Sequence, residues 1–153
     1  MERPRAINNP MLVGAMELLK ADNSPKHRDF FLQELLKAHF LTPAVVTPKP
    51  EKDENGMVRM PPDAQIQVPM LSTHEGVRYF MAFTDMQELK KWVKSLEEGQ
   101  QLFVFGFQEF ATMVKRADSQ CDGFAVNPGG ANIRVTRKMI DTIREAMSGN
   151  MRD

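Results

Sequence analysis

Three histidines and one cysteine are the side chains of this chain that could bind a transition metal. The histidines are His27, His39 and His74, with 11 and 34 residues between them. Another 46 residues separate His74 from Cys121. A local metal site places two ligands within a few residues of each other, as CxxC, HxxxH or HExxH do, and none of these spacings occurs. The sequence therefore predicts no metal and no other cofactor.

Cys121 and the adjacent Asp122 are the residues to consider for nucleophilic catalysis. The thiol would be reactive if it were exposed near a cation, whereas a small buried residue that fills space is the simpler interpretation. No GxSxG motif marks a reactive serine. We therefore expect a protein without enzymatic activity. The alternative is a small enzyme or ligand-binding protein whose polar groups meet only in the folded chain, for example His74, Cys121, Asp122 and Arg134.

The most distinctive polar segment is NPGGAN, at residues 127–132. Its two glycines permit positive φ angles, and exposed N–H groups in such a turn can bind an anion or the carboxylate of a partner. A plain connection between two strands is the simpler interpretation. Neither GxGxxG nor GxxxxGK is present. The candidate binding residues are this turn and its expected surroundings, namely Thr84, Asp85, Asp122, Asn127, Pro128, Gly129, Gly130 and Asn132.

Residues 68–88 form the segment around which the chain is organised. The sequence predicts a strand, a tight turn at residues 74–76 and a second β-rich run at residues 77–83, which together make an antiparallel hairpin. A capping box follows at once, either Thr84 with Gln87 or Asp85 with Glu88, so a helix is predicted to start directly after the hairpin.

The remaining pattern predicts helices and strands that are interspersed along the chain. Asn9-Pro10 and Ser24-Pro25 each predict a helix start, and Pro43 is expected to end the second helix. Strands are predicted at 44–47, 66–70, 77–83, 102–105, 124–126 and 133–135, with further helices after residues 85, 106 and 136. Tyr79 and Trp92 are expected in the core.

This order predicts an α+β fold. We expect a single mixed, largely antiparallel sheet of about five or six strands, packed with helices and preceded by an N-terminal helical hairpin. One domain is expected over residues 1–153, with the hairpin at 1–42 and the α+β core at 43–153.

Composition limits the classes of partner and compartment. The chain has 20 basic and 20 acidic residues. Neither sign dominates any third of it, so we expect no nucleic-acid partner. A single cysteine cannot form an internal disulfide, and no apolar segment is long enough for a signal peptide or a membrane span. We therefore expect a cytoplasmic protein without a membrane partner.

Three segments resemble the SseB N-terminal domain family (enhanced serine sensitivity protein B and its relatives). They are FLTPAVV at residues 40–46, the segment from VPMLST to AFTD at residues 68–85, and DGFAVNPG at residues 122–129. The FTD that follows a strand and the NPG turn are the more specific pair. Their order and spacing match the family over roughly residues 30–147.

The resemblance implies a compact cytoplasmic α+β module, in a family that usually has no assigned catalysis, and it supplies no catalytic residues. The shared name also links the family to type III secretion, for which long coiled-coil or membrane-inserting segments would be expected, and the sequence has neither. We therefore expect a non-enzymatic binding or regulatory module that engages a protein or peptide partner. A homodimer that hides a methionine-rich apolar face is a further alternative.

Overall fold

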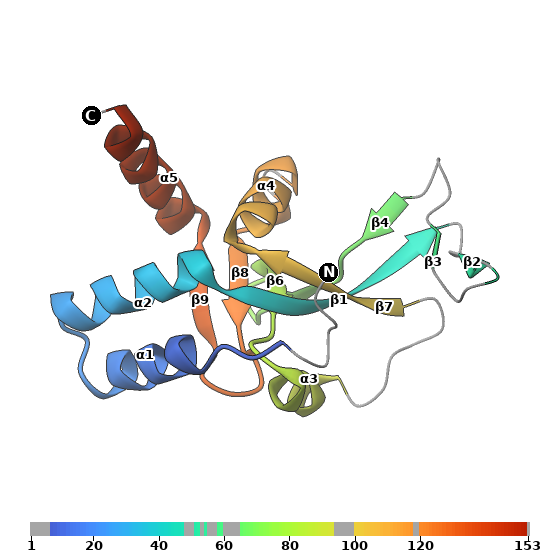
Figure 1. Ribbon diagram of the computed structural model, residues 1–153, viewed down its shortest axis with the longest axis horizontal. Coiled ribbons are helices and arrows are strands. Elements are labelled where there is room, and N and C mark those ends of the chain that lie inside the picture. Colours follow the sequence, from blue (N-terminus) through green and yellow to red (C-terminus); the bar gives the residue numbers. More distant parts are fainter. Residues whose placement is uncertain are drawn as a thin grey trace.

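The structure, a computed structural model, describes residues 7–47, 51–52, 54, 58–59, 65–93, 100–117 and 120–152 (Figure 1). None of the helices within these residues is both long enough and apolar enough to cross a bilayer. The helices are α1 (Pro10–Ala21), α2 (Pro25–Lys37), α3 (Met86–Trp92), α4 (Phe107–Ala117) and α5 (Arg137–Arg152).

The strands form two larger sheets and one short ribbon. One sheet has the order β4-β1-β7, the other has the order β5-β6-β8-β9, and β2 pairs with β3. All neighbouring strands are antiparallel except β6 and β8, which are parallel. The strands are β1 (His39–Thr47), β2 (Glu51–Lys52), β3 (Val58–Arg59), β4 (Gln65–Gln67), β5 (Met70–Ser72), β6 (Arg78–Ala82), β7 (Gln100–Gly106), β8 (Gly123–Val126) and β9 (Ile133–Thr136).

Local signals in the sequence place the starts of three helices. Asn9 and Ser24 precede prolines at the first helical positions of α1 and α2. The Ser24 hydroxyl accepts a hydrogen bond from the backbone N–H of His27 at 3.3 Å, which satisfies one of the unpaired donors at a helix start. Of the two caps proposed for α3, Asp85 is the one formed, and its carboxylate accepts from the N–H of Glu88 at 2.9 Å.

The predicted hairpin at residues 68–83 is confirmed as β5 and β6. Gly76, at φ +81°, occupies the left-handed position of the turn. Around it the N–H of Thr73 donates to the carbonyl of Val77 at 2.8 Å. The Thr73 hydroxyl in turn accepts from the N–H of Val77 at 3.1 Å. Thr73 therefore bonds to Val77 through both its backbone and its side chain.

The predicted single sheet of five or six strands is wrong, because the strands divide into two sheets. The two sheets meet at an isolated antiparallel bridge between Leu41 and Phe83. The bridge and β4 lie along the same side of β1. Leu41 pairs with Phe83 there, and four residues later Val45 pairs with Gln67 of β4. Pro43, which has no N–H to donate, falls between these two partners.

A second proline, Pro69, marks the division between the two sheets in the segment that contains β4 and β5. The strand predicted at residues 66–70 is interrupted at residues 68–69, where Pro69 separates β4 from β5. β4 pairs with β1, whereas β5 pairs with β6. Because proline removes a ladder hydrogen bond, Pro43 and Pro69 favour a change of partner at this point instead of a continuous sheet.

β1 is longer than the sequence predicts. The sequence predicts that the second helix continues to Pro43, but α2 ends at Lys37 and β1 begins at His39. Seven consecutive residues of β1, His39 to Val45, pair with β7. The apolar residues Phe40 and Leu41 are fully buried on this strand. A short apolar run fits a buried strand and a helix equally well, so pairing with β7 decides its conformation.

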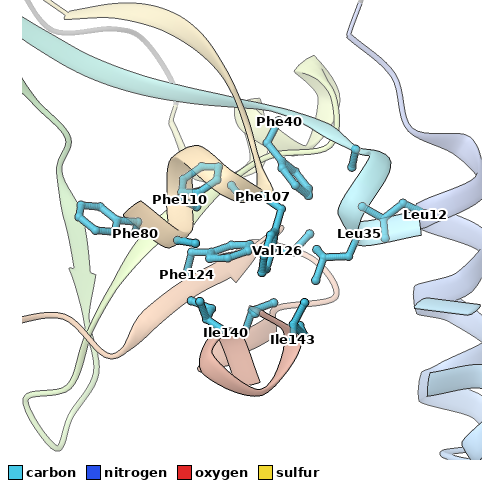
Figure 2. Packing of buried hydrophobic residues seen from close by; sticks show 14 of the residues in the cluster. Leu12, Leu35, Phe40, Phe80, Phe107, Phe110, Phe124, Val126, Ile140 and Ile143 are labelled. Atoms are coloured by element: carbon cyan, nitrogen blue, oxygen red, sulfur yellow. The ribbon is translucent and has the colours of Figure 1, made fainter. Parts of the chain in front are cut away.

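The main core lies between the four-stranded sheet and α1, α2, α4 and α5 (Figure 2). Phe110 of α4 stacks on Phe124 of β8, with ring centroids 4.8 Å apart. Phe40 of β1 and Phe107 of α4 both meet Phe124 edge to face. These aromatic contacts fix the helices against the sheet, because each ring buries a large apolar area in a specific geometry.

A second, smaller cluster lies on the other side of β1 and β6. It joins Leu41, Met81 and Phe83 to Leu89 of α3 and to Ile7. Phe80 and Ala82 belong to the first cluster, so β6 is buried on both faces, as its almost continuous apolar sequence favours. This cluster therefore packs α3 beside the ends of β6 and β8, where most of the predicted site residues lie.

Candidate functional site

Asn127 joins the two halves of the predicted site. It follows β8, is 3% exposed and has φ +54°, a left-handed conformation that asparagine tolerates better than most residues. Its side-chain Oδ1 accepts a hydrogen bond from the N–H of Thr84 at 2.9 Å. Its Nδ2 donates to the Thr84 hydroxyl at 3.0 Å. The sequence grouped these two residues, and the structure brings them into direct contact.

The network continues from Thr84 into α3 and α1. The Thr84 hydroxyl donates to Asp85 at 3.0 Å, and Asp85 caps α3. The side-chain amide of Asn9 donates to the carbonyl oxygens of Thr84 and of His39, each at 2.8 Å. Asn9 therefore ties the start of α1 to β1 and to the end of β6. Thr84, Asp85 and Asn127 are thus occupied in holding elements together.

The glycine pair of the NPGG turn lies against α3 (Figure 1). A Cβ atom at Gly130 would come within 2.4 Å of Oε1 of Glu88, and a Cβ at Gly129 would lie 3.1 Å from Cβ of Lys91. Glu88 also pairs with Lys91 at 2.5 Å. Gly129 therefore allows the turn to approach the backbone of α3 closely, whereas the atom nearest to Gly130 is the end of a flexible side chain that could shift.

Two of the turn's backbone N–H groups point inward. The N–H groups of Gly130 and Asn132 both donate to the carbonyl of Asn127, at 2.9 and 2.8 Å. An anion-binding turn needs such groups to be exposed and convergent. The geometry of these two groups therefore supports the simpler interpretation of the turn as a connection between β8 and β9.

Asp122 lies apart from the turn. It precedes β8, whereas Asn127 follows it, so the two residues are separated by about 16 Å of extended chain. Asp122 instead accepts a hydrogen bond from the Tyr79 hydroxyl at 3.3 Å. The Arg134 guanidinium lies over the Tyr79 ring, 5.3 Å from its centroid. Burial, followed by the Asp122 charge, raises the pKa of Tyr79.

Cys121 is buried and bound to the backbone. Its Sγ–H donates to the carbonyl of Gly123 at 3.1 Å, and the side chain is 3% exposed. Burial raises the pKa of the Cys121 thiol, so the protonated form dominates near neutral pH. A thiol in this state is a poor nucleophile, in agreement with the space-filling interpretation.

A side-chain groove of about 420 Å³ adjoins the NPGG turn. Three elements enclose it: the turn between β5 and β6, the end of α3, and the start of β9 with the turn before it. Two of the predicted binding residues, Pro128 and Asn132, line it. We call it the Trp92 groove, lined by Leu71, Ser72, Thr73, His74, Glu75, Trp92, Pro128, Asn132 and Arg134.

Trp92 is the residue that sequence reasoning missed. The sequence predicts it in the core, but it is 46% exposed at the last position of α3. Leu89, one turn earlier, is buried. Helical spacing puts both residues on one face, yet Trp92 is the last residue of α3 and belongs to neither buried cluster. The pair Lys90-Lys91 before it is the one sequence signal of a helix end at the surface.

The four residues proposed for an active site do not share one pocket. His74 and Arg134 line the Trp92 groove, whereas Cys121 and Asp122 line a second cavity of about 700 Å³ with Arg78 and Arg137. The Cys121 thiol is bonded to a carbonyl, not to a base. Within the described ranges, no three His, Cys, Asp or Glu side chains are close enough to hold a metal ion.

The chain belongs to the SseB N-terminal domain family. The model of that family matches residues 12–142 of the 153-residue chain, which confirms the resemblance carried by the three segments at 40–46, 68–85 and 122–129. Comparison with curated proteins and with solved structures gives no match.

Proposed function

We propose that this member of the SseB N-terminal domain family is a non-enzymatic binding module that recognises a protein or peptide partner at the Trp92 groove. The observation that carries the proposal is the exposure of Trp92 on a groove that Arg134 also lines and that two turns border. Exposed tryptophan and arginine are the residue types that most often dominate the binding energy of a protein interface.

The groove offers both apolar and polar recognition. The Trp92 indole supplies a flat apolar surface, and Leu71 and Pro128 extend it. Arg134 lies over the Tyr79 ring, a contact that favours one orientation of the guanidinium before a partner arrives. An arginine that is already oriented loses less conformational freedom when it pairs with a carboxylate. The preferred partner segment therefore carries an apolar side chain next to an acidic group.

The chemistry of Cys121 supports binding over catalysis at the neighbouring cavity. Its thiol is hydrogen-bonded and protonated, and Asp122 is engaged with Tyr79. A small-molecule ligand in the cavity lined by Arg78 and Arg137 is the alternative, and Arg78 would be its main cationic contact, because Nη2 of Arg137 donates to the carbonyls of Val114 and Cys121. The cytoplasm is the compartment we propose, because a lone buried thiol has no disulfide partner within the chain.

A displayed peptide library tests the proposal. Selection on the wild-type protein should enrich peptides that combine an apolar residue with Asp, Glu or a C-terminal carboxylate. Trp92→Ala and Arg134→Gln should each weaken binding by about tenfold or more, because both remove a central contact. Leu18→Ala is the matched control: Leu18 is similarly exposed, at 44%, but lies on α1 and lines none of the groove.

Selected peptides that bind Trp92→Ala, Arg134→Gln and the wild type with the same affinity would place recognition elsewhere. If Arg78→Gln alone abolished binding of a small anion, the cavity beside Cys121 would be the functional site instead.

A further inference from the structure

The edges of the two described sheets differ in how they are protected against pairing with another chain. An edge strand exposes unpaired N–H and C=O groups, and soluble proteins protect such edges with short strands, prolines or charges. β4 and β5 have three residues each and are separated by Pro69. β9 has four residues and carries Arg134. These three edges are therefore protected.

β7 has none of these protections along most of its length, and among the described residues a charged side chain approaches it only at its last residue, where the N–H of Gly106 donates to the Glu109 carboxylate at 3.2 Å. It runs for seven residues, Gln100–Gly106, with the sequence QQLFVFG, which contains neither a charge nor a proline. It is the last strand of the order β4-β1-β7, so no described strand lies beyond it. All seven residues are partly exposed. β7 is thus the longest described edge, and the most apolar.

The hydrogen-bonding pattern of β1 shows which groups of β7 face outward. Leu41 exchanges backbone hydrogen bonds with Phe83, at 2.8 and 3.0 Å, so its N–H and C=O point away from β7. Leu41 lies opposite Val104. In an antiparallel sheet, a residue whose N–H and C=O groups point away from the neighbouring strand forms a non-bonded pair with the residue opposite. Non-bonded pairs alternate with hydrogen-bonded pairs along the strand. The N–H and C=O groups of Val104 and of Leu102 therefore point away from β1.

We propose that β7 pairs antiparallel with β7 of a second copy of this chain, which joins two three-stranded sheets into one sheet of six strands. An overlap centred on Phe103 places Phe103 opposite Phe103 on the two-fold axis and Leu102 opposite Val104. This register matches the outward groups, because the N–H and C=O groups of Leu102 and Val104, which point away from β1, then face each other across the new interface. The interface is isologous, as expected for a symmetric dimer.

The side chains favour a second copy as the occupant. The pairing brings no like charges together, since β7 has none. Phe103 stacks on Phe105, with centroids 5.9 Å apart, yet belongs to neither buried cluster. In the dimer it would be covered by its symmetry mate, an aromatic cross-strand pair at the position where the two backbones approach most closely.

The dimer does not need a methionine-rich face. Of the methionines whose side chains are described, only Met11 is exposed. It lies at the start of α1, which is not part of the β7 edge. The structure therefore points to an edge-to-edge interface in place of the methionine-rich face expected from composition.

Disulfide trapping tests the register. In a Cys121→Ser background, Phe103→Cys places the two new thiols on the axis, where Cα atoms of a non-bonded antiparallel pair lie about 4.5 Å apart. This separation allows a disulfide. The matched control is Gln101→Cys on the same strand face, whose two thiols would be offset by four residues, about 13 Å. Oxidation with diamide should yield covalent dimer from Phe103→Cys and little from Gln101→Cys.

Sedimentation equilibrium tests the association itself. The wild type should be a dimer, and Phe103→Lys should be a monomer, because it opposes two like charges at the axis. Gln101→Lys adds the same charge off the axis and should remain dimeric. Circular dichroism shows whether each variant is folded, and if Phe103→Lys does not fold, the trapping experiment decides. A monomeric wild type, a dimeric folded Phe103→Lys, or equal trapping at both positions would overturn the proposal.

Discussion

The side-chain amide of Asn127 makes both of its hydrogen bonds to one residue, Thr84, which lies 43 positions earlier in the chain. Through this pair the end of β8 is joined to the end of β6 at the point where α3 begins. Thr84 is fully buried and Asn127 almost so. The contact thereby fixes the position of α3, and with it the position of Trp92.

We expect Asn127→Ala to lower the free energy of unfolding by about 2–4 kcal/mol, because it leaves the buried N–H of Thr84 unpaired and places alanine at φ +54°. Asn132→Ala is the matched control. Asn132 has φ +52° but is exposed, so its replacement should cost only the backbone term, about 1 kcal/mol. Urea denaturation measures both, and equal losses would show that the Asn127 side chain contributes nothing.

Thr42→Val should stabilise the protein. Thr42 is fully buried on β1, and its hydroxyl finds no partner among the described residues. Valine has nearly the same shape and removes the unpaired group, so we expect a gain of about 1 kcal/mol. Thr136→Val is the control with the opposite sign, because the Thr136 hydroxyl accepts from the N–H of Met139 at the start of α5. It should lose about 1 kcal/mol. A loss for Thr42→Val in thermal denaturation would show that its hydroxyl is bonded.

Gly123→Ala should prevent stable folding, whereas Gly14→Ala should be tolerated or stabilising. At Gly123, with φ +150°, a Cβ would come within 2.0 Å of the Val135 carbonyl oxygen, and only backbone movement between β8 and β9 could relieve this clash. At Gly14, inside α1, nothing lies within 4 Å of a Cβ. Alanine there should add about 0.5–1 kcal/mol, since glycine is the poorer helix former. Soluble yield and thermal melting compare the two, and a normal melting curve for Gly123→Ala would contradict the packing described.

Stability should fall at alkaline pH because of Cys121. Burial raises the pKa of its thiol, so the folded chain holds this proton at a pH where the unfolded chain has released it. The stabilisation is complete below the unfolded pKa of a cysteine, about 8.5, and is lost as pH rises through the folded pKa. Cys121→Ala should flatten this part of the profile, and Tyr79, whose pKa is also raised, should add a second fall at higher pH. Urea unfolding from neutral to alkaline pH measures it, and parallel profiles for both proteins would contradict it.

Much of the secondary structure could be predicted because its signals are local. Asn9-Pro10, Ser24-Pro25 and Asp85 with Glu88 mark helix starts through interactions within one turn of chain. The hairpin around Gly76 is local in the same way. The division into two sheets is not local, since it depends on Leu41 meeting Phe83 while Val45 meets Gln67. The positions of Pro43 and Pro69 fit the division into two sheets, but they do not predict it unless the strand pairing is already known.

The candidate site was predictable only in part, because it depends on strand pairing. Thr84, Asp85 and Asn127 come together because parallel pairing of β6 with β8 brings the ends of both strands to one edge of the sheet. The sequence groups Asp122 with them because it adjoins β8, but Asp122 precedes this strand and therefore lies at its opposite end. The exposure of Trp92 depends on where α3 ends, and helical periodicity alone does not specify that end.

The fluorescence of Trp92 tests the central claim most directly, because Trp92 is the single tryptophan of the chain and lies in the proposed binding groove. Titration with the best library peptide should shift its emission to shorter wavelength in a saturable way, since a bound partner removes the indole from water. Arg134→Gln should weaken that titration by about tenfold. A peptide that binds by calorimetry without changing Trp92 emission, and with equal affinity for Arg134→Gln, would contradict recognition at this groove.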